Sequence, residues 1–173
     1  AAPEVVVRLL RTLSRASGVA GMAGGQAIDL EMVGAHPDEG ALLRMQSMKT
    51  GALIVAAVLM GAQSGRWEEL SEASKGGLAL YGHSLGIAFQ VVDDILDCTQ
   101  DTATLGKTAG KDEKDDKPTW VSILGLEGAR ERARALRADA QRGLDLIAQD
   151  PSVPEGALVR LTEIADYVVA RSY

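Results

Sequence analysis

Apolar and polar positions repeat with the period of a helix along most of the chain. Several stretches place apolar side chains three or four positions apart, which is the spacing of one helical face. Breaks rich in glycine or proline separate them at 34–40 and at 150–154. The pattern predicts an all-α protein with helices over 5–16, 18–30, 41–63, 76–98, 120–149 and 156–172.

The predicted helix over 76–98 has two different faces. At 100° per residue, its glycines and acids share one sector while Leu, Ile, Val and Ala cover the rest. We therefore expect one face in the core and the other reserved for a ligand. Glycines on that second face would leave room for a bulky group. The sector contains Gly82, Gly86, Gln90, Asp93 and Asp97, with Asp94 on its flank.

Folding alone does not account for these acids. Asp93 and Asp97 stand at i,i+4, where like charges repel, and Asp is a poor residue in a helix interior. The predicted helix end at residue 98 would make these carboxylates more destabilising still, because negative charges oppose the macrodipole there. A bound Mg²⁺ would neutralise them, since Mg²⁺ takes one or two carboxylates, keeps waters and binds substrate phosphates. The alternative is a solvated acidic helix end without a ligand.

Composition narrows the class of protein. The 173 residues are one domain's worth, 46% hydrophobic but only 3% aromatic, which fits a helical core of Ala, Leu, Val and Ile. The net charge of −6 argues against nucleic acid and anionic membranes as partners. A single Cys98 excludes an internal disulfide, fits a reducing compartment, and is expected as a small core residue. The longest uncharged apolar run, 51–64, is too short to span a bilayer, so we expect a soluble, cytoplasmic protein.

Two further features suggest an anion beside the acids. Lys49, with Thr50, marks the polar mouth of the apolar helix over 41–63, where a lysine is costly unless it is paired; the alternative is snorkelling to solvent. Gly18, Gly21, Gly25 and Asp29 are predicted to line one helical face, which favours either a ligand or tight helix packing. The charged segment 99–119 is predicted to be a lid loop, or alternatively a mobile solvated loop.

With these motifs together, the sequence resembles the trans-isoprenyl diphosphate synthases, in particular the bacterial farnesyl/geranylgeranyl type. Four motifs in the right order carry the resemblance and cover most of 18–119. They are GMAGGQAIDL at 21–30, MKTGAL at 48–53, FQVVDDILD at 89–97, and LGKTAGKD at 105–112 followed by KPT at 117–119. The resemblance implies an all-α helical bundle of the isoprenoid synthase type around a deep cavity. It also implies a Mg²⁺-dependent, homodimeric prenyltransferase that condenses isopentenyl diphosphate head-to-tail with an allylic diphosphate.

Carried over by motif, the resemblance implies three groups of site residues. The metal ligands would be Asp93, Asp94 and Asp97, with Asp93 the most direct. The catalytic residues would be Lys49 and Lys107, which hold the allylic diphosphate, and Thr50 and Gln90, which present oxygens to the developing cation. The substrate-binding residues would be Gln26, Asp29, Phe89 and the lid contact Lys117.

The chain departs from the family in one large respect. The family's first aspartate-rich motif and its basic segment for isopentenyl diphosphate are absent from these residues, so residues 1–173 match the C-terminal part of one synthase domain. We therefore expect the chain alone to be inactive and to expose an apolar face where further helices pack. A non-catalytic diphosphate-binding or regulatory subunit of a synthase complex is the alternative. A terpene cyclase is a third reading, disfavoured by the lysines and by the scarcity of aromatics.

Overall fold

The computed structural model describes the backbone of residues 2–105 and 118–171 and the side chains of 2–99 and 118–171. All regular elements in these ranges are helical, which confirms the predicted all-α class. They are α1 (Pro3–Ser17), α2 (Met22–Glu31), α3 (Glu39–Gln46), the π-helical segment η1 (Ser47–Gly51), α4 (Ala52–Gln63), the 3₁₀ turn η2 (Trp67–Glu69), α5 (Glu72–Leu105), α7 (Trp120–Ala148) and α8 (Val159–Ala170).

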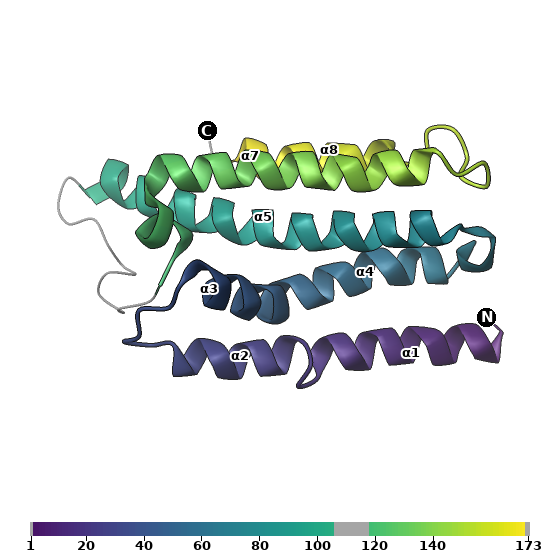
Figure 1. Ribbon diagram of the computed structural model, residues 1–173, viewed down its shortest axis with the longest axis horizontal. Helices are drawn as coiled ribbons and strands as arrows, with labels where there is room; N and C mark the ends of the chain where they lie inside the picture. The colour runs from purple at the N-terminus through teal and green to yellow at the C-terminus, as the bar shows by residue number, and fades with distance from the viewer. Residues whose placement is uncertain (1, 106–117, 172–173) are drawn as a thin grey trace.

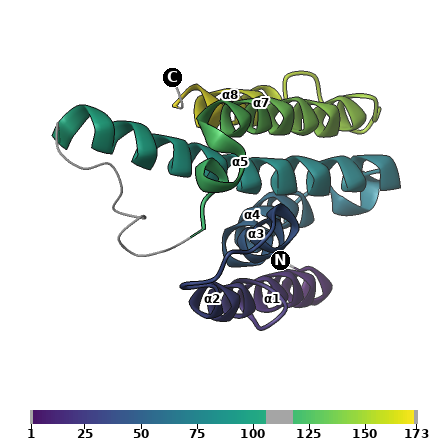
Figure 2. The same ribbon diagram turned by 60° about the vertical axis from the view of Figure 1, so that its left-hand side comes forward.

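The helices stack in successive layers. The nearly collinear α1 and α2 form one edge, α3 and α4 run back along them, α5 follows, and α7 with α8 forms the opposite edge (Figure 1). The turned view keeps this order and shows the end of α5 projecting beyond its neighbours (Figure 2). The core lies mainly where α5 meets α7, and its largest fully buried side chains include Trp120, Tyr81, Leu42 and Ile87.

Glycines set how closely these layers approach. A Cβ added at Gly82 would lie 3.0 Å from the Cα of Val55, and one at Gly86 would lie 2.8 Å from the Cα of Gly51. The backbone of α4 and η1 therefore fills the space beside both glycines. The prediction that these two glycines leave room for a ligand is wrong; they permit close helix packing.

The boundaries differ from the sequence prediction in two places. Helix α5 begins at Glu72 and continues to Leu105, so the predicted loop start at Thr99 is wrong. Asp97 consequently lies about two turns before the helix end, outside the last turn where the macrodipole acts. Gly18 and Gly21 lie in the turn that precedes α2, so the second glycine stripe is not a single helical face.

Two statements about solubility and burial also change. Cys98 is exposed, so the expectation of a small core residue is wrong. The continuous helix Glu39–Gln63 has the length and composition of a membrane span, unlike the shorter run considered from the sequence. One such helix is weak evidence, because apolar helices inside soluble proteins meet the same criterion. Here it packs between α1–α2 and α5.

A buried carboxylate ties the far end of the stack together. One oxygen of Asp150 accepts the backbone N–H of Ser71 at 2.8 Å and the hydroxyl of Ser74 at 2.6 Å. The other accepts the backbone N–H and hydroxyl of Ser152 at 3.0 and 2.7 Å. These donors, the Ser74 hydroxyl foremost, hold the pKa of Asp150 well below its ordinary value.

This lowered pKa predicts acid sensitivity. The ionised form is favoured in the folded state, so its stabilisation is present above the unfolded-state pKa of about 4 and is lost as the pH falls below it. Urea unfolding of the full-length protein between pH 6 and 3 should show a declining midpoint, with a shallower decline in Asp150→Asn. An unchanged slope in that variant would contradict the assignment. Asp145→Asn, at an exposed position in α7, is the matched control.

Candidate functional site

Lys49 and Asp29 form an ion pair between adjacent elements. The Nζ of Lys49 lies 2.7 Å from Oδ2 of Asp29, and their side chains are 32% and 14% exposed. Lys49 is thus paired rather than simply snorkelling, as its position at the mouth of an apolar helix requires. The Lys49 side chain remains partly exposed, which leaves room for a further anionic partner.

Lys49 and Thr50 lie within the π-helical segment η1, between two glycine contacts. A Cβ at Gly25 would fall 2.2 Å from the backbone nitrogen of Lys49, and one at Gly86 would fall 2.8 Å from the Cα of Gly51. Helices α2 and α5 therefore clamp η1 from two sides. Short π-helical turns inside α-helices are frequent at functional sites. The clamp fixes the segment that carries Lys49.

The glycine contacts also set the register of α5 against α4. Gly82 meets Val55 and Gly86 meets Gly51, so the two helices run antiparallel. One further turn of α5 brings Gln90 about level with Ser47, at the start of η1. The aspartates of α5 follow Gln90 directly. The acidic part of α5 therefore begins just beyond the Ser47 end of η1.

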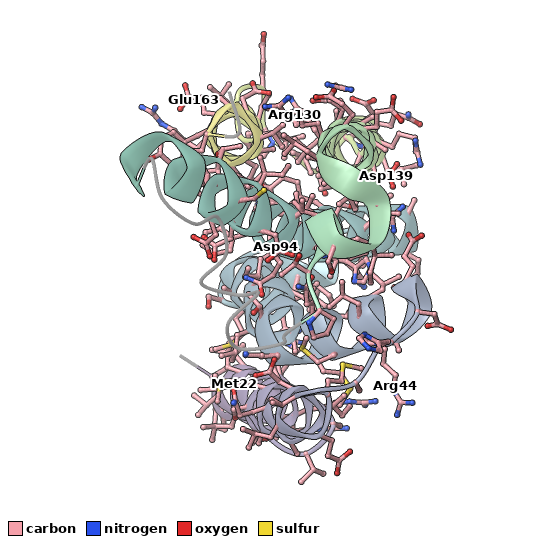
Figure 3. The ribbon with its side chains drawn as sticks, turned by 90° about the vertical axis from the view of Figure 1, so that its left-hand side faces the viewer. Met22, Arg44, Asp94, Arg130, Asp139 and Glu163 are labelled. Carbon is pink, nitrogen blue, oxygen red and sulfur yellow. The ribbon has the colours of Figure 1, made fainter. Side chains whose placement is uncertain are left out.

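The three aspartates do not have equivalent surroundings. Asp93 and Asp97 are exposed, whereas Asp94 is half-buried and points towards α7. Oδ2 of Asp94 accepts the backbone N–H of Trp120 at 2.8 Å. Figure 3 shows Asp94 between α5 and the first turn of α7.

Trp120 links the acidic helix to the lysine-bearing segment. Its side chain is completely buried, and its indole N–H donates to Oε1 of Gln46, the residue before η1. The guanidinium of Arg132 lies 5.5 Å from the centre of its ring and reaches Glu39 of α3 at 3.8 Å. Neither Trp120 nor Gln46 was among the predicted site residues. No local pattern marks such long-range hydrogen bonds, although Gln46 shares a helical face with Lys49 and Thr50.

The other predicted residues are distributed around this centre. Thr50 and Gln90 are half-buried, while Gln26 is exposed on α2. The ring of Phe89 lies 4.8 Å from the guanidinium of Arg171, at the end of α8. Lys107 and Lys117 lie outside the described residues.

The donor chemistry of the acidic face suits Mg²⁺. Asp93 and Asp97 offer hard oxygens from consecutive turns of one helix, and Mg²⁺ uses few carboxylates together with water and phosphate oxygens. Among the described side chains, no group of three or more His, Cys, Asp or Glu residues is arranged to hold a metal ion. The fit therefore rests on two exposed carboxylates and an oxygen-bearing ligand.

The fold is an all-α bundle with an aspartate-rich helix, α5. Beside this helix lies η1, which carries Lys49 and is packed between glycines of α2 and α5. The polyprenyl synthetase family model matches residues 4–147. The chain belongs to this family.

Individual relatives agree with this assignment. The chain is 46% identical to the farnesyl diphosphate synthase of Escherichia coli K12, over 98% of the chain and 56% of that protein. It is 40% identical to geranylgeranyl pyrophosphate synthase 9 of Arabidopsis thaliana, over 98% and 46%. A Helicobacter pylori geranyltransferase structure, complexed with magnesium and isoprenyl diphosphate, matches with a TM-score of 0.73 at 30% identity, over 98% and 52%. The chain thus spans about half the length of the relatives it matches.

Proposed function

We propose that the full-length protein is a Mg²⁺-dependent prenyl diphosphate synthase, and that this chain supplies its aspartate-rich helix and the segment that carries Lys49. It would condense isopentenyl diphosphate head-to-tail with an allylic diphosphate, giving a product of the geranyl, farnesyl or geranylgeranyl class. The observation that carries the proposal is the bridge through Trp120, which joins Asp94 of α5 to Gln46 beside Lys49. Names of the relatives support the substrate class.

Part of the chemistry that this reaction needs has candidate residues in the chain. Asp93 and Asp97 would hold Mg²⁺, which supplies charge stabilisation for a diphosphate leaving group when it is bound. Lys49, oriented by Asp29, would bind the same oxygens, and Lys107 and Lys117 are proposed for that role from their motif alone. Thr50 and Gln90 would face the allylic carbon with their oxygens, while Gln26 and Phe89 would line the substrate site.

The proposed reaction is a displacement at the allylic carbon. The allylic C–O bond breaks and its electron pair leaves with inorganic pyrophosphate. The terminal double bond of isopentenyl diphosphate then forms the new C–C bond, and one proton is lost from the adjacent carbon. Positioning of the two carbons and exclusion of water account for most of what the protein must do.

The Lys49→Ala variant of the full-length protein tests the proposal. Loss of a cation aimed at the leaving group should lower kcat/KM for the allylic diphosphate by about 100-fold. The measurement is pyrophosphate release with and without isopentenyl diphosphate. The matched control is Lys75→Ala, whose lysine pairs with Glu72 at the other end of α5. Near-wild-type turnover in Lys49→Ala would remove this residue from the mechanism. Substrate binding without any turnover by the wild type would favour the regulatory-subunit alternative.

The oligomeric state is proposed to be a homodimer formed through the outer face of α1 and α2. Apolar side chains on α1 face outward at i,i+4 and i+7, and Leu10 is 60% exposed. Exposed apolar residues continue along α2 and the adjoining turns. The set is Val6, Leu10, Leu13, Val19, Met22, Leu30 and Val33. This edge of the stack has no further layer on it in the described part of the chain (Figure 1).

Sedimentation equilibrium of the full-length protein tests this interface. Leu10→Asp should convert a dimer into a monomer, because a charge would be buried at the contact. Ile164→Asp, at an exposed position of α8, should leave the dimer intact. A monomeric wild type or a dimeric Leu10→Asp protein would contradict the proposal. We further propose a cytoplasmic location without stable membrane insertion and without nucleic-acid binding, in keeping with the net charge of −6.

A further inference from the structure

We propose that Asp94 is a positioning residue rather than a metal ligand, and that it holds Trp120 so that the acidic helix and the lysine-bearing segment keep their relative places. This inference rests on the proposed function for its catalytic meaning. It assigns two roles within one motif: Asp93 and Asp97 would bind the metal, and Asp94 would position Trp120. Its geometry is independent of any bound ligand.

Asp94 faces a different direction from the other two acids of its motif. Its neighbours Asp93 and Asp97 are exposed on one side of α5, whereas Asp94 is half-buried, about 100° from Asp93 and about 60° from Asp97 around the helix, against the start of α7. Its Oδ2 already accepts the backbone N–H of Trp120 at 2.8 Å. An N–H in the first turn of a helix has no acceptor within that helix, so an external acceptor is needed. A carboxylate provides a strong one.

The helical turn that carries Trp120 depends on such contacts for its position. Gly125 has φ 71° and ψ 165°, which interrupts α7 directly after its first turn. That turn is therefore not held in line by the long helix behind it. Thr119 and Ser122 close its own end reciprocally through a capping box. Its position relative to the rest of the protein must come from side-chain contacts.

On its other side, this turn contacts the residue that precedes η1. The indole N–H of Trp120 donates to Gln46, and Gln46 immediately precedes η1. Both N–H groups of Trp120 are thus used, one towards α5 and one towards the start of η1. Arg132 over the ring adds a link to Glu39 of α3. If Asp94 releases the backbone N–H, the indole loses its place beside Gln46, and the spacing between Lys49 and the acidic face changes.

The test compares two substitutions at Asp94 with the same two at Asp93 in the full-length protein. Asp94→Asn keeps an oxygen that accepts the Trp120 N–H but removes the charge, whereas Asp94→Ala removes both. Asp93→Asn and Asp93→Ala are the matched controls one residue earlier. Three quantities are measured: the unfolding temperature in EDTA, the emission maximum of Trp120 and the binding of Mg²⁺ with inorganic pyrophosphate by calorimetry. Trp120 emission is obtained as the difference from the Trp120→Phe protein.

The positioning role predicts a crossed pattern. Asp94→Ala should lower the unfolding temperature and shift Trp120 emission to longer wavelength without any metal present. Asp94→Asn should restore both, and should keep the affinity for Mg²⁺ and pyrophosphate within about threefold of wild type, since it retains the hydrogen bond. Asp93→Asn should leave emission and unfolding unchanged but weaken that affinity by about tenfold or more.

Two results would overturn the inference. One is a loss of Mg²⁺–pyrophosphate affinity in Asp94→Asn that equals the loss in Asp93→Asn. The other is an unchanged Trp120 emission in Asp94→Ala. Failure of the proposed function has a different signature: wild type would bind no Mg²⁺–pyrophosphate at all, while the emission and unfolding of the Asp94 variants would still decide whether the carboxylate holds Trp120.

Discussion

Replacing Asp93 with alanine in the full-length protein should lower kcat/KM for the condensation by about 100- to 1,000-fold, which is the range for losing a group that stabilises transition-state charge. Asp93 is exposed and stands four residues before Asp97, so both carboxylates can reach one cation from consecutive turns. Removing it should raise the Mg²⁺ concentration needed for half-maximal rate. Helicity should remain unchanged, because the side chain is not in the core.

Steady-state kinetics at several Mg²⁺ concentrations provide the measurement, with circular dichroism to confirm the fold. Glu131→Gln is the control, since it also removes one negative charge from an exposed helical position, on α7. Its kinetics should match those of wild type. An Asp93→Ala protein with wild-type kcat/KM and an unchanged Mg²⁺ requirement would exclude Asp93 from metal binding. The acidic face would then be a solvated helix surface.

The second large effect is expected at Gly25. A methyl group there would lie 2.2 Å from the backbone nitrogen and 2.6 Å from the Cα of Lys49. Backbone atoms cannot rotate away as a side chain can, so α2 and η1 must separate. We expect Gly25→Ala to lower the free energy of unfolding by about 3 kcal/mol, at the upper end of overpacking costs. The separation should also displace Lys49 from Asp29 and lower turnover.

Urea unfolding at neutral pH measures this cost, and the chain offers a matched control. Gly76→Ala introduces the same methyl group into helix α5, where no atom lies within 4 Å of it. That substitution should be neutral or should stabilise by about 0.5–1 kcal/mol, because alanine is the better helix former. Equal unfolding midpoints for Gly25→Ala and Gly76→Ala would show that α2 does not pack on η1 as described.

Several parts of the fold follow from local sequence. The apolar spacing predicts the existence of the helices near α1, α5, α7 and α8, since burial of one face repeats every three or four residues. The i,i+4 aspartates on α5 mark a face whose charges folding does not explain. Lys49 within a long apolar segment likewise predicts an anionic partner, and Asp29 provides one in the structure.

Other parts depend on contacts that no local pattern records. Gly82 and Gly86 are predicted to leave room for a ligand, and only the packing of Val55 and Gly51 against them shows that they serve a helix contact instead. The π-helical register of η1 and the continuation of α5 to Leu105 have no clear sequence signal. The bridge from Asp94 through Trp120 to Gln46 joins positions 26 and 74 residues apart.

The central claim is that the acidic face of α5 gathers magnesium around a diphosphate held by Lys49. Crystals of the full-length protein soaked with magnesium chloride and inorganic pyrophosphate test it most directly. We predict Mg²⁺ on Asp93 and Asp97, pyrophosphate oxygens on that metal and on the Lys49 ammonium, and an Asp94 that still accepts the backbone N–H of Trp120. A helix end without metal or pyrophosphate under these conditions would contradict it.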